Sequence, residues 1–294
     1  MRDFDYLEPT SVEEASRMLA DLEDEEVRLI AGGTALILTL RQRMLRPQYL
    51  VSLAKVDRLH GIEFDEKAGL RIGALSRHAD IAASPLVRQH FPVLASMAQR
   101  VANPQVRNQG TIGGNLCYGD PSTDPPSCLL ALDASVVLGS TRGERTMPLD
   151  EFIVDYFETA LEPDEVLLEI RVPPLAQGTG AVYSRFLRTA AEHRPLVSVA
   201  FVAHRDGTVC RDARIAVGAT TPIPTRLRQV EAFLEGRSVT PAVAAEAADM
   251  VAQGIEPLSD SRGDETYRRN MVRAVARRSI SELFELSVDE GVSA

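Results

Sequence analysis

One stretch of seventeen residues, from Gly110 to Pro126, restricts the fold more than any other part of the chain. It reads GTIGGNLCYGDPSTDPP and holds four of the 19 glycines and three of the 17 prolines. Glycine lowers helix stability, and proline lacks the N–H that a helix interior or a central strand needs. The stretch therefore predicts neither helix nor strand but a long loop, and long loops in compact domains usually have a function.

The polar groups of this predicted loop suit a ligand that accepts hydrogen bonds. Gly113 and Gly114 have no Cβ, so the backbone can come close to a ligand and direct N–H groups at it. Asn115 and residues 122–124, which are Ser, Thr and Asp, add side chains that form hydrogen bonds. The stretch is therefore a candidate binding site.

A second glycine pair lies earlier in the chain, between a predicted strand at residues 27–31 and a predicted helix at residues 35–44. A strand, a glycine pair and a helix start together direct free N–H groups at an anion. By itself such a pair is usually a tight turn, and neither a G-x-G-x-x-G motif nor a P-loop is present. Two such segments in one domain suit a diphosphate bound through backbone dipoles, which requires no cluster of lysines.

The order of predicted elements indicates two α+β domains. Strands and helices alternate up to about Pro174, and the prolines and glycines of residues 173–180 form the best linker candidate. Beyond this linker the sequence predicts consecutive strands and then helices. The strands are expected at residues 181–187, 198–205, 208–210 and 214–219, and the helices at 226–234, 241–253 and 266–286.

Composition excludes several classes of protein. The net charge of −10 argues against a nucleic-acid partner, and no apolar run approaches the roughly 18–20 residues of a membrane span. Cys117, Cys128 and Cys210 are widely spaced without a C-x-x-C motif, so a zinc or iron–sulfur site in this chain is not expected. Sparse cysteines and an N-terminus unlike a signal peptide indicate a cytoplasmic protein.

Four motifs in order make the sequence similar to a known family. They are AGGTA at residues 31–35, GTIGGN at 110–115 followed by two Asp-Pro pairs, LEPDEVL at 161–167, and DSRGD at 260–264 followed by Tyr267-Arg268. With these motifs the chain resembles, almost end to end, the FAD-binding medium subunit of the molybdenum hydroxylases. That family includes xanthine dehydrogenase and aerobic carbon monoxide dehydrogenase.

The resemblance implies a fold. It implies an α+β, bipartite FAD-binding domain of the vanillyl-alcohol-oxidase (PCMH) type over residues 1–176, with subdomains of about 1–57 and 58–176. A small α+β C-terminal domain of the carbon monoxide dehydrogenase flavoprotein type, an antiparallel sheet plus helices, would follow over residues 177–294.

The resemblance also implies a set of cofactor-binding residues, without a catalytic residue or a metal ligand. The two glycine segments would bind the FAD diphosphate, Asp124 would contact the cofactor, and Leu161 and Leu167 would present backbone groups near the isoalloxazine. Arg185 takes the place of a basic residue, usually Lys, beside the flavin. The family usually has an aromatic residue near the position of His193, and a Ser where this chain has Ala35. The expected FAD-binding residues are Ala31, Gly32, Gly33, Thr34, Ala35, Thr111, Ile112, Gly113, Gly114, Asn115, Asp124, Leu161, Leu167 and Arg185.

The function implied by the resemblance is electron transfer. The chain would be the FAD-binding subunit of a molybdenum hydroxylase, with a large molybdopterin subunit and a small [2Fe-2S] subunit as partners in a dimer of heterotrimers. It would take electrons from the clusters and pass them to an external acceptor. Two alternatives stay open: a self-sufficient FAD-dependent oxidase with its substrate site in the C-terminal domain, and a non-redox module that binds a nucleotide.

Other chemistry-bearing residues favour ordinary roles. Four of the five histidines, His193 being the exception, are expected to be surface or core residues because their spacing suits no metal. Cys117 is expected to be a packing residue rather than an electron relay. The arginines between residues 268 and 278 give the last predicted helix a basic side, which is either solvated or a docking face.

Overall fold

The chain forms two compact units, described over residues 3–286 of a computed structural model. Within that range the first unit comprises residues 3–120 and 133–174, and the second comprises residues 121–132 and 175–286. The units differ from the two expected domains in one internal segment, residues 121–132, which belongs to the second unit. The expected division after residue 176 stays a prediction, and the outer ends of both domains lie outside the described residues.

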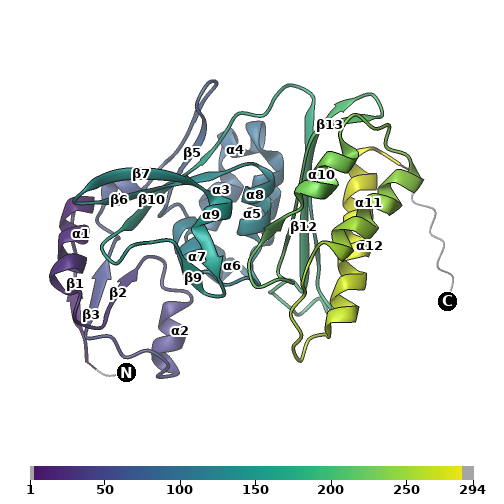
Figure 1. The fold of residues 1–294 in the computed structure, drawn as a ribbon. Helices are drawn as coiled ribbons and strands as arrows, with labels where there is room; N and C mark the ends of the chain where they lie inside the picture. Colours follow the sequence, from purple (N-terminus) through teal and green to yellow (C-terminus); the bar gives the residue numbers. More distant parts are fainter. Residues whose placement is uncertain (1–2, 287–294) are drawn as a thin grey trace. The chain divides into compact units, whose positions relative to one another are not determined.

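The first unit contains a three-stranded parallel sheet at its N-terminus (Figure 1). The central strand β3 (Tyr49–Ser52) pairs in parallel with β1 (Asp5–Leu7) on one side and with β2 (Val27–Ile30) on the other. Two helices connect these strands, α1 (Val12–Asp21) and α2 (Leu36–Arg41). This is the crossover that parallel pairing requires.

A five-stranded antiparallel sheet, in the order β4-β5-β10-β6-β7, forms the rest of the first unit together with short helices. Its strands are β4 (Ile62–Asp65), β5 (Gly69–Gly73), β6 (Ser135–Ser140), β7 (Gly143–Pro148) and β10 (Val166–Val172). A small hairpin pairs β8 (Ile153–Asp155) with β9 (Glu158–Thr159). The helices of this part are η1 (Asp57–Leu59), α3 (His78–Ala83), α4 (Pro85–His90), α5 (Pro92–Arg100), α6 (Pro104–Gln109), α7 (Ile112–Tyr118) and α9 (Leu149–Phe152).

Helix α1 joins the two sheets of the first unit into one core. The spacing of Ser11 and Glu14 in the sequence favours a capped helix start. Ser11 caps α1 by accepting from the Glu14 amide at 3.1 Å, and Glu14 Oε2 reaches back to accept from the Thr10 amide at 2.7 Å. Its buried residues Val12 and Leu19 pack in one cluster with Leu168 of β10. The polar turn at residues 65–69 between two apolar runs predicts a hairpin over residues 61–74, and β4 and β5 form it.

The second unit is a four-stranded antiparallel sheet with helices on both faces. The strands, in the order β11-β12-β13-β14, are β11 (Thr179–Phe186), β12 (Val197–Asp206), β13 (Val209–Gly218) and β14 (Thr225–Arg226). Alternate residues of β12, including Val199 and Phe201, pack in the core with α10 (Arg228–Leu234), α11 (Pro241–Gln253) and α12 (Glu265–Leu283). Figure 1 shows these three helices on one face of β12 and β13.

The segment of residues 121–132 covers the opposite face of that sheet. It contains α8 (Pro125–Ala131), whose Ser127 hydroxyl lies 3.0 Å from the Ser198 hydroxyl of β12. A Cβ added to Gly218 of β13 would lie 3.0 Å from the Ser127 Cβ, so the glycine lets the helix approach the strand.

The prediction that residues 110–126 contain no helix is wrong, because α7 and the start of α8 lie inside them. Thr111 caps α7 by accepting from the Gly114 amide, and Gly119, at φ 63°, ends it in the left-handed region. Pro125 occupies the first turn of α8, where the missing N–H costs nothing. The prolines therefore mark helix starts, and packing offsets the low helix propensity of the glycines.

Two smaller differences follow from local geometry. The strands predicted separately at residues 208–210 and 214–219 form one strand, β13, since Asp212 takes a positive φ of 49° and the ladder continues past an irregularity. The helix predicted over residues 35–44 is limited to α2, and its last predicted turn contains Arg43 at φ 59°.

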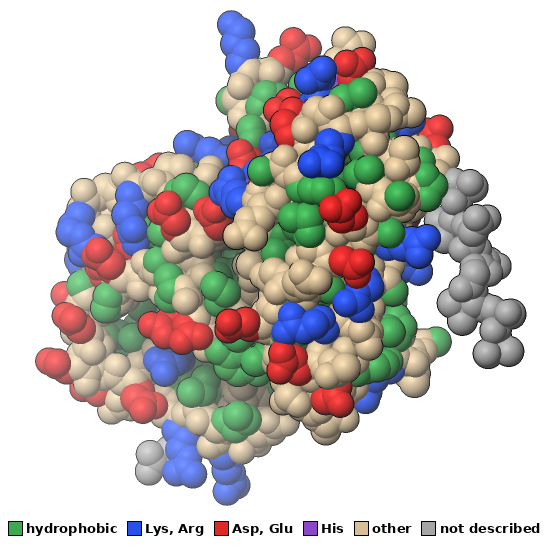
Figure 2. All heavy atoms as spheres, turned by 45° about the vertical axis from the view of Figure 1, so that its right-hand side comes forward, with side chains coloured by type: hydrophobic (Ala, Val, Ile, Leu, Met, Phe, Trp, Pro, Cys, Tyr) green, Lys and Arg blue, Asp and Glu red, His purple; other side chains and the backbone are tan. Residues whose placement is uncertain are grey.

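Charged side chains of both signs are interspersed over the face drawn in Figure 2. Such mixing is typical of a surface that stays in solution rather than one that attracts a polyanion. No helix among residues 3–286 is long and apolar enough to cross a membrane.

A buried carboxylate fastens the five-stranded sheet. Glu169 of β10 is 1% exposed and accepts from Arg58 at 2.6 Å, from Arg71 at 2.5 Å and from Arg171 at 2.7 Å. Burial alone would raise the pKa of Glu169, but the hydrogen bonds from the three arginines lower it to about 2. The ionised carboxylate thus connects the segment before β4 with β5 and β10.

We expect Glu169→Gln to lower the free energy of unfolding by about 2–3 kcal/mol, because three arginines lose their shared anion. The matched control is Glu63→Gln, which removes an exposed carboxylate 3.3 Å from the same Arg71 and should cost at most about 0.5 kcal/mol. Chemical denaturation of both variants measures the difference, and equal costs would contradict a central role for Glu169.

The same substitution has a predicted pH dependence. The folded pKa of Glu169 lies below its unfolded value, so the stabilisation is complete above about pH 5 and is lost as the pH falls towards 2. The gap between wild type and Glu169→Gln should therefore stay constant from pH 8 to about pH 5 and narrow below it. If the gap in stability widened on acidification, the predicted sign of the pH dependence would be wrong.

Candidate functional site

The two glycine segments, residues 31–35 and residues 110–115, meet in the first unit. A Cβ added to Gly32 would lie 1.9 Å from the Gln109 carbonyl oxygen and 3.0 Å from the Gly110 Cα, and one added to Gly114 would lie 3.7 Å from the Ala31 Cβ. Only glycine allows such a close approach of two backbones. The structure thus brings together the two segments that the sequence analysis paired.

The first glycine segment presents a row of free amides. Within residues 3–286, no carbonyl or side chain accepts a hydrogen bond from the amides of Gly32, Gly33, Thr34 or Ala35. Gly33 adopts a positive φ of 68°, and residues 31–35 are half-buried. Consecutive free N–H groups beside a left-handed residue form a concave site for an anion.

The second glycine segment is held from behind by the turn after β5. The amides of Ile112 and Gly113 donate to the carbonyls of Ser76 at 3.0 Å and Ala74 at 2.9 Å, so they are not available to a ligand. The expectation that Gly113 directs its N–H at a ligand is therefore wrong. A Cβ there would lie 2.6 Å from the Ala74 Cβ, which makes Gly113 a packing residue.

Gly114 and Asn115 form the accessible side of the second segment. Gly114 is exposed and Asn115 half-buried, whereas Thr111, Ile112 and Gly113 are buried. The Gly114 amide donates to Thr111 Oγ1 at 3.1 Å, which fixes the first turn of α7. The face that the second segment presents is thus Gly114 and Asn115.

The two leucines of the LEPDEVL motif lie in the same unit and differ in their surroundings. Leu167 is 3% exposed, and its Cδ2 would lie 2.8 Å from a Cβ on Gly113, so it supports the second glycine segment from β10. Leu161 is half-buried in the turn before β10. Arg145 holds that turn by donating to Glu165 at 2.6 Å and to the Ala160 carbonyl at 2.8 Å.

A histidine that the sequence analysis assigned an ordinary role lies at the junction of the two segments. His78 is 1% exposed, and its amide donates to the Gly110 carbonyl at 3.1 Å. A Cβ on Gly110 would lie 3.4 Å from His78 Cδ2 and 3.3 Å from Thr34 Oγ1. Histidine spacing carried no signal for this role, because the neighbours of His78 come from distant parts of the chain.

Asp124 and Arg185 form an ion pair in the second unit. The Asp124 carboxylate is 2% exposed, accepts from the Tyr183 hydroxyl at 2.7 Å and lies 3.1 Å from Arg185 Nη1. Burial, with the neighbouring Asp124 charge, raises the pKa of Tyr183 well above its usual value, so the phenol stays protonated and donates. That both residues bind the cofactor stays a prediction.

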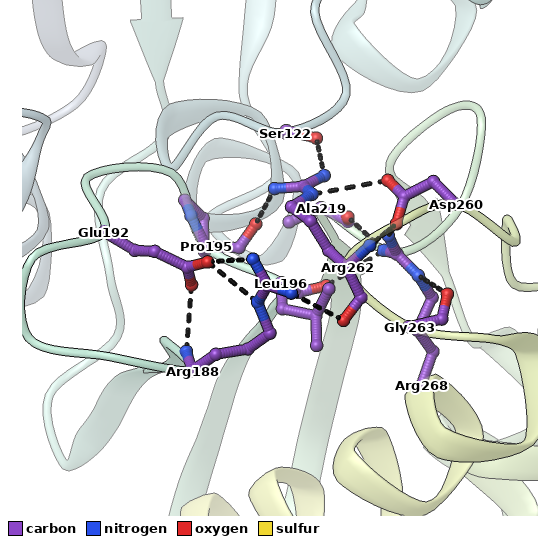
Figure 3. A network of polar contacts seen from close by, with 10 residues as sticks. All are labelled: Ser122, Arg188, Glu192, Pro195, Leu196, Ala219, Asp260, Arg262, Gly263 and Arg268. Carbon is purple, nitrogen blue, oxygen red and sulfur yellow. Dashed lines mark hydrogen bonds and ion pairs between the residues drawn. The ribbon is translucent and has the colours of Figure 1, made fainter.

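The DSRGD motif builds a polar network in the second unit, drawn in Figure 3. Arg262 donates to the Ser122 hydroxyl at 3.0 Å and lies 3.3 Å from the Asp260 carboxylate. Its carbonyl accepts from Arg188, which also donates to Glu192 at 2.7 Å. The motif therefore orders the 187–196 loop, in which His193 is exposed.

The basic side of α12 is partly internal, contrary to both predicted alternatives. Arg268 is 0% exposed and lies 2.6 Å from Asp260, while Arg269 donates to the Ala252 carbonyl at 2.6 Å and Arg273 lies 2.5 Å from Asp249. Arg277 and Arg278 are exposed. Helical spacing identified a charged side but could not show which partners the fold would place against it.

The cysteines and the acidic side chains form no centre of their own. All three cysteines are free, and burial raises the pKa of the Cys117 thiol to about 12, which suits packing rather than reactivity. Among residues 3–286, no group of three or more His, Cys, Asp or Glu side chains is arranged to hold a metal ion.

Comparison with known families identifies the class of protein. Residues 2–175 match the FAD-binding domain of molybdopterin dehydrogenases, and residues 181–283 match the C-terminal domain of the carbon monoxide dehydrogenase flavoprotein. The chain therefore belongs to the FAD-binding subunits of the molybdenum hydroxylases, a family of oxidoreductases.

Relatives of known function cover almost the whole chain. The alpha subunit of the 6-hydroxypseudooxynicotine dehydrogenase complex of Paenarthrobacter nicotinovorans is 36% identical over 95% of this chain and 94% of its own length. The carbon monoxide dehydrogenase medium chain of Hydrogenophaga pseudoflava is 35% identical over 95% and 96%. The solved carbon monoxide dehydrogenase from that organism, which lacks the Mo-pyranopterin moiety, matches with a TM-score of 0.92, 35% identity and coverage of 97% and 98%.

The chemistry of the joined segments fits the diphosphate of FAD. Four free backbone amides suit phosphate oxygens, and the missing Cβ atoms leave room for close approach. The Thr34 hydroxyl adds one further donor beside them. Of the fourteen expected residues, twelve lie in the first unit, and Asp124 and Arg185 lie in the second.

We expect Gly32→Ala to lower the free energy of unfolding by about 3 kcal/mol, because its Cβ would force Gln109 away from the first glycine segment. Gly33→Ala is the matched control. Its Cβ would make only a slightly tight contact, 3.3 Å from an Ile37 side-chain carbon that can shift by a few tenths of an ångström. The substitution should therefore cost only about 1 kcal/mol, mainly for its positive φ. Chemical denaturation measures the stability cost of both variants. If the backbone contact were unimportant, Gly32→Ala would cost no more than Gly33→Ala.

Proposed function

We propose that the chain binds FAD through the two glycine segments and acts as the electron-transfer subunit of a heteromeric molybdenum hydroxylase. The observation that carries the proposal is the meeting of residues 31–35, with their free amides, and residues 110–115. When bound, FAD supplies the redox chemistry, taking up electrons one at a time and releasing them to an acceptor.

The residues of this chain bind and orient the cofactor. The amides of Gly32, Gly33, Thr34 and Ala35 donate to the diphosphate, and Gly114 keeps the opposite side free of a side chain. Asn115 offers an amide group at the same edge. Thr111 and Leu167 hold the second segment in place without touching the phosphates, by capping α7 and by packing under Gly113.

Asp124 and Arg185 form an ion pair within the second unit, and the proposal includes both as cofactor-binding residues. Because the Asp124 carboxylate is already bonded to Tyr183 and Arg185, it acts mainly by fixing these two side chains. Arg185 then provides the positive charge that the family usually takes from a lysine. The Leu161 backbone completes the set of expected contacts.

The partners are chains of the same enzyme. A large molybdopterin subunit oxidises the substrate, a small [2Fe-2S] subunit carries the electrons, and the assembly is a dimer of heterotrimers in the cytoplasm. The names of the relatives support this proposal, since they include a medium chain and a subunit of a dehydrogenase complex.

Purification tests the cofactor. We expect the full-length chain, alone or with its partners, to be yellow and to release FAD on denaturation in about one equivalent. The self-sufficient oxidase is tested by adding organic substrates to the isolated chain, where no bleaching of the flavin is expected. Bleaching that occurs only when the partner subunits are present supports the relay role. A colourless complex without flavin would contradict the proposal.

Gly114→Asp tests the position of the diphosphate. The carboxylate would lie at the exposed side of the second glycine segment, so we expect FAD content to fall at least about tenfold from charge repulsion. Gly114→Asn is the matched control, since it has the same shape without the charge and meets Thr111 Oγ1 in the same way. Equal FAD content in the two variants would place the phosphates elsewhere.

A further inference from the structure

The ring of His78 lies where the two glycine segments touch, and the mechanism above does not use it. His78 begins α3, and its neighbours are bonded to the second glycine segment, since the Ser76 carbonyl accepts from the Ile112 amide at 3.0 Å and Arg77 pairs with Thr111. The position of the imidazole is thus fixed by the same backbone contacts that fix residues 110–115.

The surroundings of His78 leave a polar atom unsatisfied. Its Nδ1 is fully buried and has no hydrogen-bond partner among the described residues. The Thr34 hydroxyl lies near the same contact, since both groups flank Gly110. Because burying a polar atom without a partner costs free energy, the unsatisfied Nδ1 calls for an explanation.

The ring is uncharged at neutral pH. Burial, together with the positive charge of Arg107, lowers the pKa of His78 to about 4. A neutral imidazole carries one N–H donor and one bare nitrogen. A half-turn about the Cβ–Cγ bond exchanges Cδ2 with Nδ1 without changing the outline of the ring, and this places the unpaired nitrogen at the ring edge that faces Gly110.

We propose that His78 is a positioning residue for the cofactor, acting through Thr34. When the diphosphate binds, the imidazole N–H donates to Thr34 Oγ1, and the Thr34 O–H donates to a phosphate oxygen. Two bonds in series polarise one another, so the hydroxyl becomes a stronger donor than it would be alone. The inference rests on the proposed function, since it requires FAD at residues 31–35.

A double-mutant cycle on FAD binding tests the coupling. Flavin-free full-length chain is titrated with FAD, and the dissociation constant is obtained from flavin fluorescence for wild type, His78→Leu, Thr34→Val and the double variant. We expect each single change to weaken binding about tenfold, and the double change also about tenfold rather than about a hundredfold. Additive effects, or wild-type binding by His78→Leu, would overturn the proposal.

Controls separate positioning from folding. His204 is a matched histidine because its Nδ1 is also buried and unpaired, but it lies on β12 of the second unit. His204→Leu should leave the dissociation constant unchanged. His78→Asn restores a side-chain N–H and should recover binding to within about threefold of wild type. If His78→Leu does not fold, His78→Phe, which keeps a ring without nitrogen, takes its place in the cycle.

The outcomes also separate this inference from the proposed function. If the wild-type chain binds no FAD, the proposed function fails. If wild type binds FAD but the His78 and Thr34 effects add, the proposed function stands and the coupling is wrong.

Discussion

The contact on which the rest of the first unit depends is the approach of the Gly32 backbone to the carbonyl of Gln109. The space between them does not admit a single Cβ carbon. This contact determines where the segment after β2 of the parallel sheet meets the start of α7, which lies in the chain between β5 and β6 of the antiparallel sheet. Thr111, the turn of residues 74–76 and Leu167 then hold that helix start from three directions. A rigid support of this kind is what an anion site built from backbone amides needs.

The two glycine segments have different tasks, although their sequences look alike. In the second segment, the carbonyls of Ala74 and Ser76 accept hydrogen bonds from the amides of Gly113 and Ile112. Its glycines therefore allow close packing of the backbone rather than offering free amides. In the first segment the amides stay free, and Gly33 supplies the left-handed turn that exposes them. A pair of glycines thus predicts that another group approaches the backbone closely. Whether that group is a ligand or another part of the chain depends on the tertiary fold.

This difference between the two glycine segments shows what could be predicted from the sequence and what depends on the tertiary fold. The capping box of Ser11, the β4–β5 hairpin and helix α11 follow from local rules, and the structure confirms them. Helix α7 could not be predicted locally, because Gly113 and Gly114 are poor helix formers whose cost is offset by contacts with β5 and β10. The position of His78 between the two segments could not be predicted for the same reason, since its neighbours lie more than 30 residues away in the chain. The pairing of the two segments could be predicted, because two glycine segments in one domain suit a diphosphate.

The charge distribution explains why backbone dipoles suit this chain. Only two of its 32 basic residues are lysines, Lys55 and Lys67, and its net charge is −10. Several arginines are held by buried carboxylates, as Arg71 is by Glu169 and Arg145 is by Glu165. An arginine fixed in such a pair cannot turn to a phosphate without leaving a buried anion behind. Backbone amides take part in no such ion pair, so a diphosphate site can be built from them without weakening the ion pairs that stabilise both units.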